Sequence, residues 1–216
     1  MPLDENVIAE LVDSGVIFDT FRRLPSAKKE RIYRTAIELF GEYGYDGLAV
    51  DRLCDQAGIS KGSFFQYFAS KSHLLEFAVL VFDDYLGSVV DELRQNDPAV
   101  LARDRLRYLY HALVVNSRLF AAEERFYLFV TRAVDHSAIA LRGIDLERHF
   151  YAYVTDIIDR GEQTGEIRGD FDVALTGRLC SLVIGALVTR HYSGDRLPHR
   201  HMEEYLVSFL FDGIKA

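Results

Sequence analysis

The twelve residues from Ser60 to Lys71 carry side chains whose types and spacing suit contact with nucleic acid. Lys61 and Ser63 flank Gly62, and Gln66 follows about one helical turn later. An ammonium or a hydroxyl can donate to phosphate oxygens or base edges, whereas a glutamine amide can pair with both N6 and N7 of adenine. Gly62 has no side chain that would hold the backbone away from a duplex. We expect Gln66 to discriminate between bases, by about 1–3 kcal/mol.

Secondary-structure elements must position these side chains. The local pattern predicts two short helices joined by a glycine turn. The first is expected over about 50–57, where Leu53 and Cys54 are apolar and Gly58 ends the helix. The second, over about 60–68, has Ser60 as its expected N-cap and would bury Phe64 and Phe68. Two short helices of this kind form a helix-turn-helix, which can place its second helix in the major groove. The same unit is also ordinary packing in many proteins that bind no DNA.

Longer helices are predicted on both sides of this motif. One runs over 26–43, with Ser26 as a plausible N-cap and Gly44 as a stop, and another over 70–94. Further helices are expected over 98–120, 122–134, 140–163, 172–192 and 199–213, with no alternating strand pattern. The fold class is therefore predicted to be all-α.

A longer set of residues keeps its spacing without a gap around the motif. It comprises Ala36, Phe40, Gly44-Tyr45, Leu53, Ala57-Gly58-Ile59-Ser60-Lys61-Gly62, Phe64, Tyr67-Phe68, Ser70-Lys71 and Leu74-Leu75. On these residues, 28–75 resembles the DNA-binding domain of the TetR (tetracycline repressor) family. The segment from Ile157 to Arg168 resembles the end of a later helix in that family.

The resemblance implies a domain plan and a function. Residues 1–25 would be an N-terminal extension, 26–70 the three-helix DNA-binding domain, and 71–216 a helical effector-binding and dimerisation domain entered by a long fourth helix. The implied protein is a homodimeric transcription regulator, commonly a repressor, that binds a pseudo-palindromic operator in double-stranded DNA and responds to a small molecule. It would be no enzyme and would need no cofactor. The residues expected to contact DNA are Lys28, Ser60, Lys61, Gly62, Ser63, Phe65, Gln66, Tyr67 and Lys71, of which Tyr67 and Lys71 resemble the family's phosphate contacts.

Two positions depart from the family pattern. Phe65 stands where many relatives have tyrosine, and its ring would either meet a thymine methyl or pack inward. Ala49 replaces the usual Ser or Thr cap of the first short helix, at a cost of ~1 kcal/mol. Operator preference therefore cannot be inherited from relatives.

The charge of the chain is distributed unevenly. The net charge is −8, which disfavours nucleic-acid binding for the chain as a whole. Residues 21–75, however, hold nine basic and six acidic residues. Only this window is suited to approach DNA.

Between Val173 and Val188 nearly every residue is apolar or small, which is too wide an apolar surface for a helix with one wet face. We expect a second subunit to cover it, although a fully buried helix within one chain is the alternative. The expected dimer contacts are Leu175, Gly177, Leu179, Ser181, Leu182, Gly185, Ala186, Tyr205 and Phe209.

The region after residue 100 is also rich in aromatic residues, which form either plain core or the lining of an effector pocket. Tyr108, His111, Arg118, Phe126, Phe129 and Tyr151 are the candidate effector contacts. Such a lining would suit a largely apolar effector with one polar group.

Other features carry less information. Cys54 and Cys180 lie far apart in apolar patterns, which favours buried thiols in a reducing cytoplasm. The apolar run over 182–189 is too short to cross a bilayer. His191, His199 and His201 are expected to be solvated rather than to bind metal. The first 25 residues either pack as an extra helix or fray. A helical enzyme and a helical protein–protein adaptor remain the alternative functions.

Overall fold

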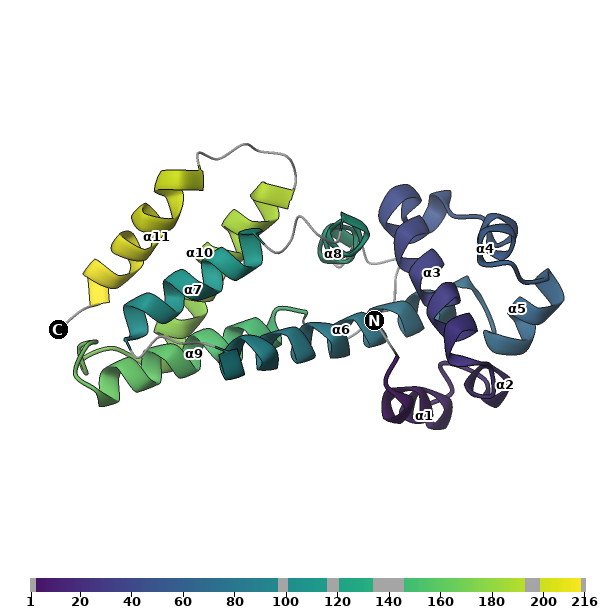
Figure 1. Cartoon of the computed structure of the whole chain (residues 1–216), viewed down its shortest axis with the longest axis horizontal. Helices are drawn as coiled ribbons and strands as arrows, with labels where there is room; N and C mark the ends of the chain where they lie inside the picture. The colour runs from purple at the N-terminus through teal and green to yellow at the C-terminus, as the bar shows by residue number, and fades with distance from the viewer. Residues whose placement is uncertain (1–2, 97–100, 116–120, 134–145, 193–198, 215–216) are drawn as a thin grey trace. The chain divides into compact units, whose positions relative to one another are not determined.

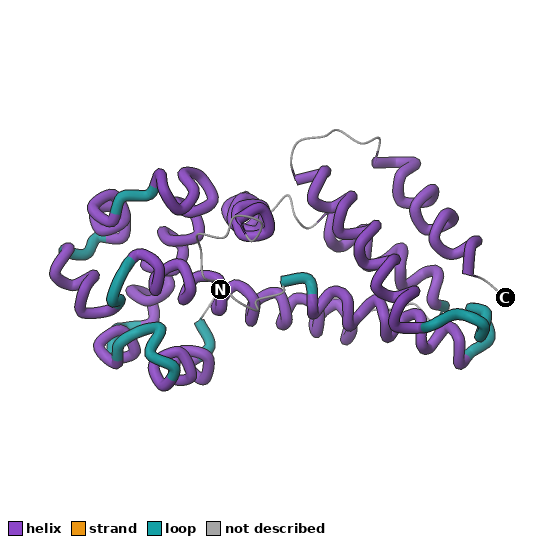
Figure 2. The backbone as a smooth tube through the Cα atoms, turned by 180° about the vertical axis from the view of Figure 1, so that it is seen from behind, coloured by secondary structure: helices purple, strands orange, loops and turns teal. Residues whose placement is uncertain are grey.

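The structure, a computed structural model, describes residues 3–96, 101–115, 121–133, 146–192 and 199–214. Over these ranges the chain is helical, with no strand, as Figures 1 and 2 show. The predicted all-α class is confirmed. The described residues form two compact units, an N-terminal unit of 3–85 with 121–133 and a C-terminal unit of 86–96, 101–115, 146–192 and 199–214.

The centre of the N-terminal unit is α3 (Ser26–Gly47), followed by α4 (Val50–Ala57), α5 (Lys61–Tyr67) and the first part of α6 (Lys71–Asn96). The predicted stop at Gly44 is present as a break inside α3, where φ is +67°. Gly58 ends α4 in the left-handed conformation, as expected for a glycine C-cap. The N-cap position of α3 is Pro25 rather than the predicted Ser26, which is the first helical residue.

The first residues of the chain fold into two further helices, α1 (Glu5–Asp13) and α2 (Asp19–Arg22), so they do not fray. Ile8 and Phe21 are fully buried against the rest of the unit. The Nζ atom of Lys29 on α3, itself buried, lies 2.6 Å from Oε1 of Glu5. The apolar spacing in this segment thus produced a packed helix.

Aromatic rings dominate the core of the N-terminal unit. The Phe77 ring lies 5.0 Å from that of Phe21 and 5.5 Å from that of Phe68, between ring centroids. Helix α8 (Ala121–Ala133) packs along α3 at Gly41, where a Cβ atom would lie 2.9 Å from the backbone nitrogen of Phe126. A glycine at this position lets the two helices approach closely.

The C-terminal unit contains the rest of α6 with α7 (Ala102–Val115), α9 (Arg148–Gln163), α10 (Val173–Tyr192) and α11 (His199–Ile214). Two predicted helix starts are wrong within the described residues. The helix expected from residue 98 begins at Ala102, after Leu101, and the one expected from 140 begins at Arg148, because Leu146 and Glu147 form a turn.

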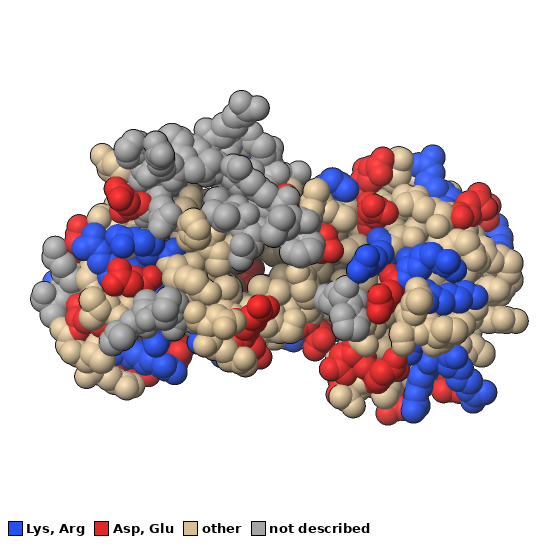
Figure 3. Space-filling model, viewed as in Figure 1, with Lys and Arg blue, Asp and Glu red and all other residues tan. Residues whose placement is uncertain are grey.

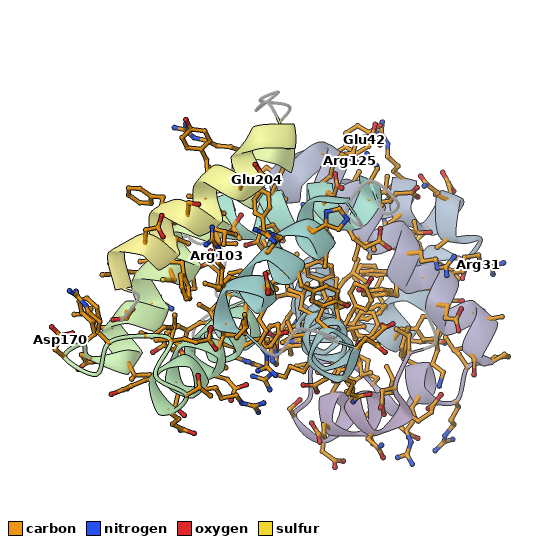
Figure 4. All side chains as sticks on the ribbon, turned by 60° about the vertical axis from the view of Figure 1, so that its left-hand side comes forward. Arg31, Glu42, Arg103, Arg125, Asp170 and Glu204 are labelled. Atoms are coloured by element: carbon orange, nitrogen blue, oxygen red, sulfur yellow. The ribbon has the colours of Figure 1, made fainter. Side chains whose placement is uncertain are left out.

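A connection after α9 holds this unit together. A Cβ atom on Gly161 would lie 2.6 Å from Cδ1 of Ile167 and 2.9 Å from Cβ of Ala102, so the three residues are in close contact. The carboxylate of Glu166 accepts a hydrogen bond of 2.9 Å from the backbone N–H of Ala102 and so caps α7. Arg103, labelled in Figure 4, donates to Oγ of Ser208 at 3.1 Å and joins α7 to α11.

The division into an extension, a DNA-binding domain and an effector domain concerns function, and it stays a prediction. Of the helices that the structure describes, none combines the length and the apolar character needed to span a membrane.

Candidate nucleic-acid interface

The recognition helix α5 is positioned by two buried phenylalanines. Phe64 and Phe68 are both fully buried, with ring centroids 5.5 Å apart, on the core side of the helix. Leu53 of α4 and Ile59 of the turn are buried as well, so the small core predicted for the motif is present. Burial of this face leaves the opposite face of α5 at the surface.

The N-terminus of α5 is capped as predicted. The Oγ atom of Ser60 accepts a hydrogen bond of 3.0 Å from the backbone N–H of Ser63, and the two serine hydroxyls lie 2.9 Å apart. Ser60 therefore fixes the start of the helix, while Ser63 keeps hydroxyl capacity on a half-buried side chain. The first helix of the motif, α4, has no such bond, since Ala49 occupies its N-cap position.

Lys61 forms an ion pair across the turn. Its Nζ atom lies 2.8 Å from Oδ1 of Asp51 on α4, and both side chains are well exposed. The hydrogen bond to this carboxylate, together with its charge, raises the pKa of Lys61. A DNA phosphate would compete with Asp51 for the same ammonium.

Gly62 lies in open space. A Cβ atom there would have only the Ser60 Oγ within 4 Å, at 3.8 Å, and the backbone φ is not in the left-handed region. Nothing within the described fold therefore requires a glycine at this position, although glycine costs about 0.5–1 kcal/mol inside a helix relative to alanine. The backbone of α5 at Gly62 is therefore open to close approach from outside the chain.

Phe65 and Gln66 both point away from the core. Phe65 is 49% exposed, and its ring lies nearly perpendicular to the Phe64 ring at a centroid distance of 5.1 Å. Phe65 is thus no core residue, and its expected contact with a thymine methyl stays a prediction. Gln66 is exposed at the surface of α5.

Tyr67, Lys28 and Lys71 have contacts within the protein. Tyr67 is buried, and its hydroxyl lies 3.4 Å from Nζ of Lys28. Nζ of Lys71 donates to the backbone carbonyls of Tyr45 at 2.6 Å and Leu48 at 3.0 Å. It also lies 4.3 Å from the centre of the Tyr45 ring. Lys71 therefore joins α6 to the end of α3. The family resemblance implied a phosphate contact for Lys71 and did not predict this structural role.

Sequence reasoning missed three residues near α5. Arg31 of α3 is exposed, and its guanidinium carbon would lie 3.7 Å from a Cβ atom on Gly58, which places it beside the turn between α4 and α5. Figure 4 shows the labelled Arg31 projecting from α3 at the surface. The other two are Phe18 and Thr20, which contact the end of α5 from the N-terminal extension. A basic window signalled Arg31, but nothing local signalled the other two.

The predicted dimer contacts separate into two sets. Leu175 and Leu179 on α10 are 60% and 57% exposed, and Tyr205 and Phe209 on α11 are 76% and 75% exposed. Leu182 and Ala186 are exposed as well. Exposed apolar side chains are therefore present on both α10 and α11.

The small residues of α10 have a different role. A Cβ atom on Gly177 would lie 2.4 Å from Oγ1 of Thr155 on α9, and Ser181 is buried. Gly185 faces Glu147, whose Oε1 would lie 3.7 Å from a Cβ atom. The prediction that Gly177 and Ser181 form dimer contacts is wrong, because these small residues let α9 approach α10 within the chain.

The candidate effector residues are not brought together within one unit. Phe126 and Phe129 belong to the N-terminal unit, where Phe126 is fully buried and Phe129 stacks on Phe40 at a centroid distance of 6.0 Å. Phe126 is a core residue and Phe129 is half-buried beside the core, so their assignment as effector contacts stays a prediction.

In the C-terminal unit, Tyr108 packs beside the core and His111 is exposed. Tyr151 donates to the carbonyl of Ala174 at 3.3 Å. Arg118 lies outside the described residues.

The two cysteines are buried and unpaired, as predicted. Burial raises the pKa of the Cys180 thiol to about 11. Within the described part of the chain, no group of three or more His, Cys, Asp or Glu side chains is arranged to hold a metal ion. The side chains of His191, His199 and His201 are outside that part, so the expectation of no metal site stays a prediction.

Comparison with known proteins agrees with the geometry of α4 and α5. Residues 32–78 match the sequence model of a family described as bacterial regulatory proteins, tetR family. The fatty acid metabolism regulator protein of Bacillus subtilis (strain 168) is 24% identical over 174 residues, which are 78% of this chain and 86% of that protein. The biofilm operon icaADBC HTH-type negative transcriptional regulator IcaR of Staphylococcus aureus (strain Newman) is 37% identical over 62 residues, 29% of this chain and 33% of that protein.

A solved structure shows the same fold over most of the chain. The crystal structure of the transcriptional regulator FadR from Bacillus subtilis in complex with stearoyl-CoA superposes with a TM-score of 0.64 at 19% identity, over 86% of this chain and 98% of that one. These similar proteins are regulators rather than enzymes. Residues 32–78 are thus similar to the tetR family of bacterial regulatory proteins, and most of the chain shares the helical fold of a solved regulator.

Proposed function

We propose that the protein is a homodimeric regulator that binds a pseudo-palindromic DNA operator and represses transcription until a largely apolar small molecule releases it. The single observation that carries DNA binding is the surface of α5. Lys61, Gly62 and Gln66 are exposed on a helix whose other face is fixed by buried phenylalanines. Side chains on such a helix meet base edges from its N-terminal turns.

The charge of the surroundings supports the same role. Figure 3 shows Lys and Arg atoms over the N-terminal unit on the face in view, interspersed with acidic atoms. Arg31 adds a cation beside the turn of the motif. A regulator that binds the chromosome acts in the cytoplasm, which is the compartment we propose for this chain.

The apolar surface of Leu175, Leu179, Leu182, Tyr205 and Phe209 supports dimerisation. Exposed aromatic and leucine side chains are typical of protein interfaces. In a two-fold dimer, the patch of one chain meets the same patch of the other, and two recognition helices about 34 Å apart read two half-sites.

The similar proteins suggest an effector to test first. FadR from Bacillus subtilis was crystallised with stearoyl-CoA, which joins a long apolar chain to an anionic head group. We propose an effector of this chemical class, a long-chain acyl thioester. It need only bind more tightly to the DNA-free state than to the DNA-bound state of the dimer.

The test of sequence-specific binding is selection from randomised duplexes by the wild-type chain, followed by comparison with Gln66→Ala. We expect wild type to enrich one motif with two half-sites, and the variant to lose about 1–3 kcal/mol of discrimination at one base pair of each half-site. The matched control is Gln163→Ala, which removes an exposed amide from α9. Enrichment of no motif by wild type would contradict the proposal.

A further inference from the structure

The N-terminal extension meets the recognition helix at the end opposite its cap. Helix α5 ends at Tyr67, so the backbone carbonyls of its last residues have no partner within the helix. The backbone N–H of Phe18 donates to the carbonyl of Tyr67 at 3.0 Å. The hydroxyl of Thr20 donates to the carbonyl of Gln66. Residues of the extension therefore cap the C-terminus of the helix that carries Gln66.

Side-chain packing fixes this junction. Phe21 of α2 is fully buried, with its ring centroid 5.2 Å from that of Phe68 and 6.0 Å from that of Tyr67. Ile17, which precedes the two capping residues, is also buried. Because both apolar contacts and hydrogen bonds hold α2 here, the extension shares one core with α5.

Two arginines follow at once in the chain. Arg22 and Arg23 are the last residue and the C-cap of α2, and both are exposed. Arg23 pairs with Asp19 of the same helix, with 79% of its own side chain exposed. The group of Lys and Arg atoms at the lower right of Figure 3 lies over α2. These cations stand next to the capped end of α5.

The backbone of Arg22 is held in place from the core. Its carbonyl accepts a hydrogen bond of 3.2 Å from Nζ of the buried Lys29, which also pairs with Glu5 of α1. Lys28, the neighbour of Lys29 on α3, reaches the hydroxyl of Tyr67 on the same end of α5. Lys28 therefore contacts that end of α5, and Arg22 and Arg23 closely follow the residues that cap it.

We propose that the extension is part of the DNA-reading surface. In this arrangement residues 18–20 cap the recognition helix and so hold Gln66 in register with the bases. Arg22 and Arg23 contact phosphates that flank those bases. This inference rests on the proposed function, because it assigns a DNA partner to a segment outside the helix-turn-helix.

The phosphate contacts of Arg22 and Arg23 and the cap formed by Thr20 should affect different measured quantities. A phosphate contact contributes about 0.9 to the slope of log K against log salt concentration and carries no sequence information. The double variant Arg22→Ala/Arg23→Ala should therefore lower the magnitude of that slope by about 2 per chain, without changing which bases are preferred. At about 0.15 M salt this corresponds to a loss of roughly 30-fold in affinity per chain.

Loss of the Thr20 cap should change base preference and leave the salt dependence of affinity unchanged. Thr20→Val keeps the size of the side chain but removes the donor to the Gln66 carbonyl. We expect it to reduce the preference for the selected duplex over a duplex altered at the Gln66 base pair, by about 3-fold to 10-fold. The salt slope should stay as in wild type.

The experiment measures affinity for the duplex that wild type selects and for its altered version, between about 50 and 200 mM salt. The matched control is Arg160→Ala/Arg168→Ala, which removes two exposed charges from the C-terminal unit. Circular dichroism and thermal unfolding check that each variant is folded. A replacement Arg22→Lys/Arg23→Lys should restore the slope, because the charges return.

Three outcomes are distinguishable. A reduced slope for Arg22→Ala/Arg23→Ala and a reduced preference for Thr20→Val support the inference. If both variants match the control while Gln66→Ala loses base preference, the inference is overturned and the proposed function stands. If wild type selects no duplex, both are overturned.

Discussion

The ammonium of Lys29 lies 2.6 Å from the carboxylate of Glu5, with the lysine side chain 3% exposed and the glutamate side chain 59% exposed. The pair joins α3 to α1. Its two partners differ in solvent exposure, because only the cation has lost its contact with water. Removing either partner should therefore have different effects on stability.

We expect Glu5→Gln to lower the free energy of unfolding by about 1–3 kcal/mol, because a buried ammonium loses its countercharge. Lys29→Met should cost less, since the exposed Glu5 is hydrated when its partner is removed. Urea unfolding measures both, with Glu10→Gln, an exposed carboxylate on the same α1 helix, as the control. A larger loss in Lys29→Met than in Glu5→Gln would contradict this reading.

Gly62→Ala should separate stability from function. The added methyl has open space within the chain, and alanine is the better helix former, so the variant should gain up to about 0.5–1 kcal/mol of stability. DNA affinity should fall at least ten-fold, since the methyl stands between α5 and the duplex.

The control is Gly213→Ala in α11, where a Cβ atom also has nothing within 4 Å. It should not change DNA affinity. Thermal unfolding and a binding titration test both variants, and unchanged DNA affinity in Gly62→Ala would remove the reason for a glycine at that position.

Gly177→Ala should have the opposite effect on stability. Its Cβ atom would lie 2.4 Å from Oγ1 and 2.9 Å from Cα of Thr155, so α9 and α10 have to move apart. Overpacking of this kind costs about 1–3 kcal/mol. Gly185→Ala, eight residues along the same helix, has only an ordinary contact at 3.7 Å and should be neutral or stabilising. Equal unfolding midpoints for the two variants would refute this account of the α9–α10 contact.

Stability should fall at alkaline pH because of Cys180. Burial raises the pKa of this thiol from 9.0 to about 11, so the folded chain holds the proton more tightly than the unfolded chain. The resulting stability is fully present below about pH 9 and is lost as the pH rises to about 11. Two pKa units correspond to about 3 kcal/mol.

Cys180→Ala should therefore lose less stability than wild type between those pH values, in urea unfolding at each pH. Cys54→Ala, which leaves the Cys180 thiol in place, should keep that part of the wild-type loss. The same pH dependence in wild type and Cys180→Ala would show that another group is responsible.

The exposed apolar surface of α10 and α11 predicts the behaviour of charged variants. Leu179→Glu and Phe209→Glu should each produce a monomer with unchanged helix content, because both side chains are exposed within the chain. Ala152→Glu, at an exposed position of α9, is the control with the same added charge. Sedimentation velocity measures the oligomeric state, and an unchanged sedimentation coefficient for Leu179→Glu would place the interface elsewhere.

The turn of the helix-turn-helix could be predicted in detail because the helix ends on both of its sides have a local signal. Gly58 provides a left-handed C-cap and Ser60 an N-cap, and both lie within a few residues of the helices that they end. Burial of Phe64 and Phe68 also followed from their spacing of four. Local spacing was enough for these features because each cap lies within a few residues of the helix end that it defines.

Contacts between distant residues could not be predicted in the same way. Thr20 and Gln66 are separated by 46 positions, and no sequence pattern connects a hydroxyl to a particular carbonyl. The stripe that includes Gly177 showed that something approaches α10 closely, but not whether the neighbour belongs to the same chain. Phe126 was aromatic and apolar in either role, so only the packing of α8 on α3 identified it as core.

Lys71 uses two of its three ammonium hydrogens on carbonyls at the end of α3. A substitution there would unseat the first turn of α6 as well as remove a charge. A loss of operator affinity in Lys71→Ala would thus combine a structural defect with the loss of a DNA contact. Substitution of a residue such as Gln66, which does not join two helices, measures recognition alone.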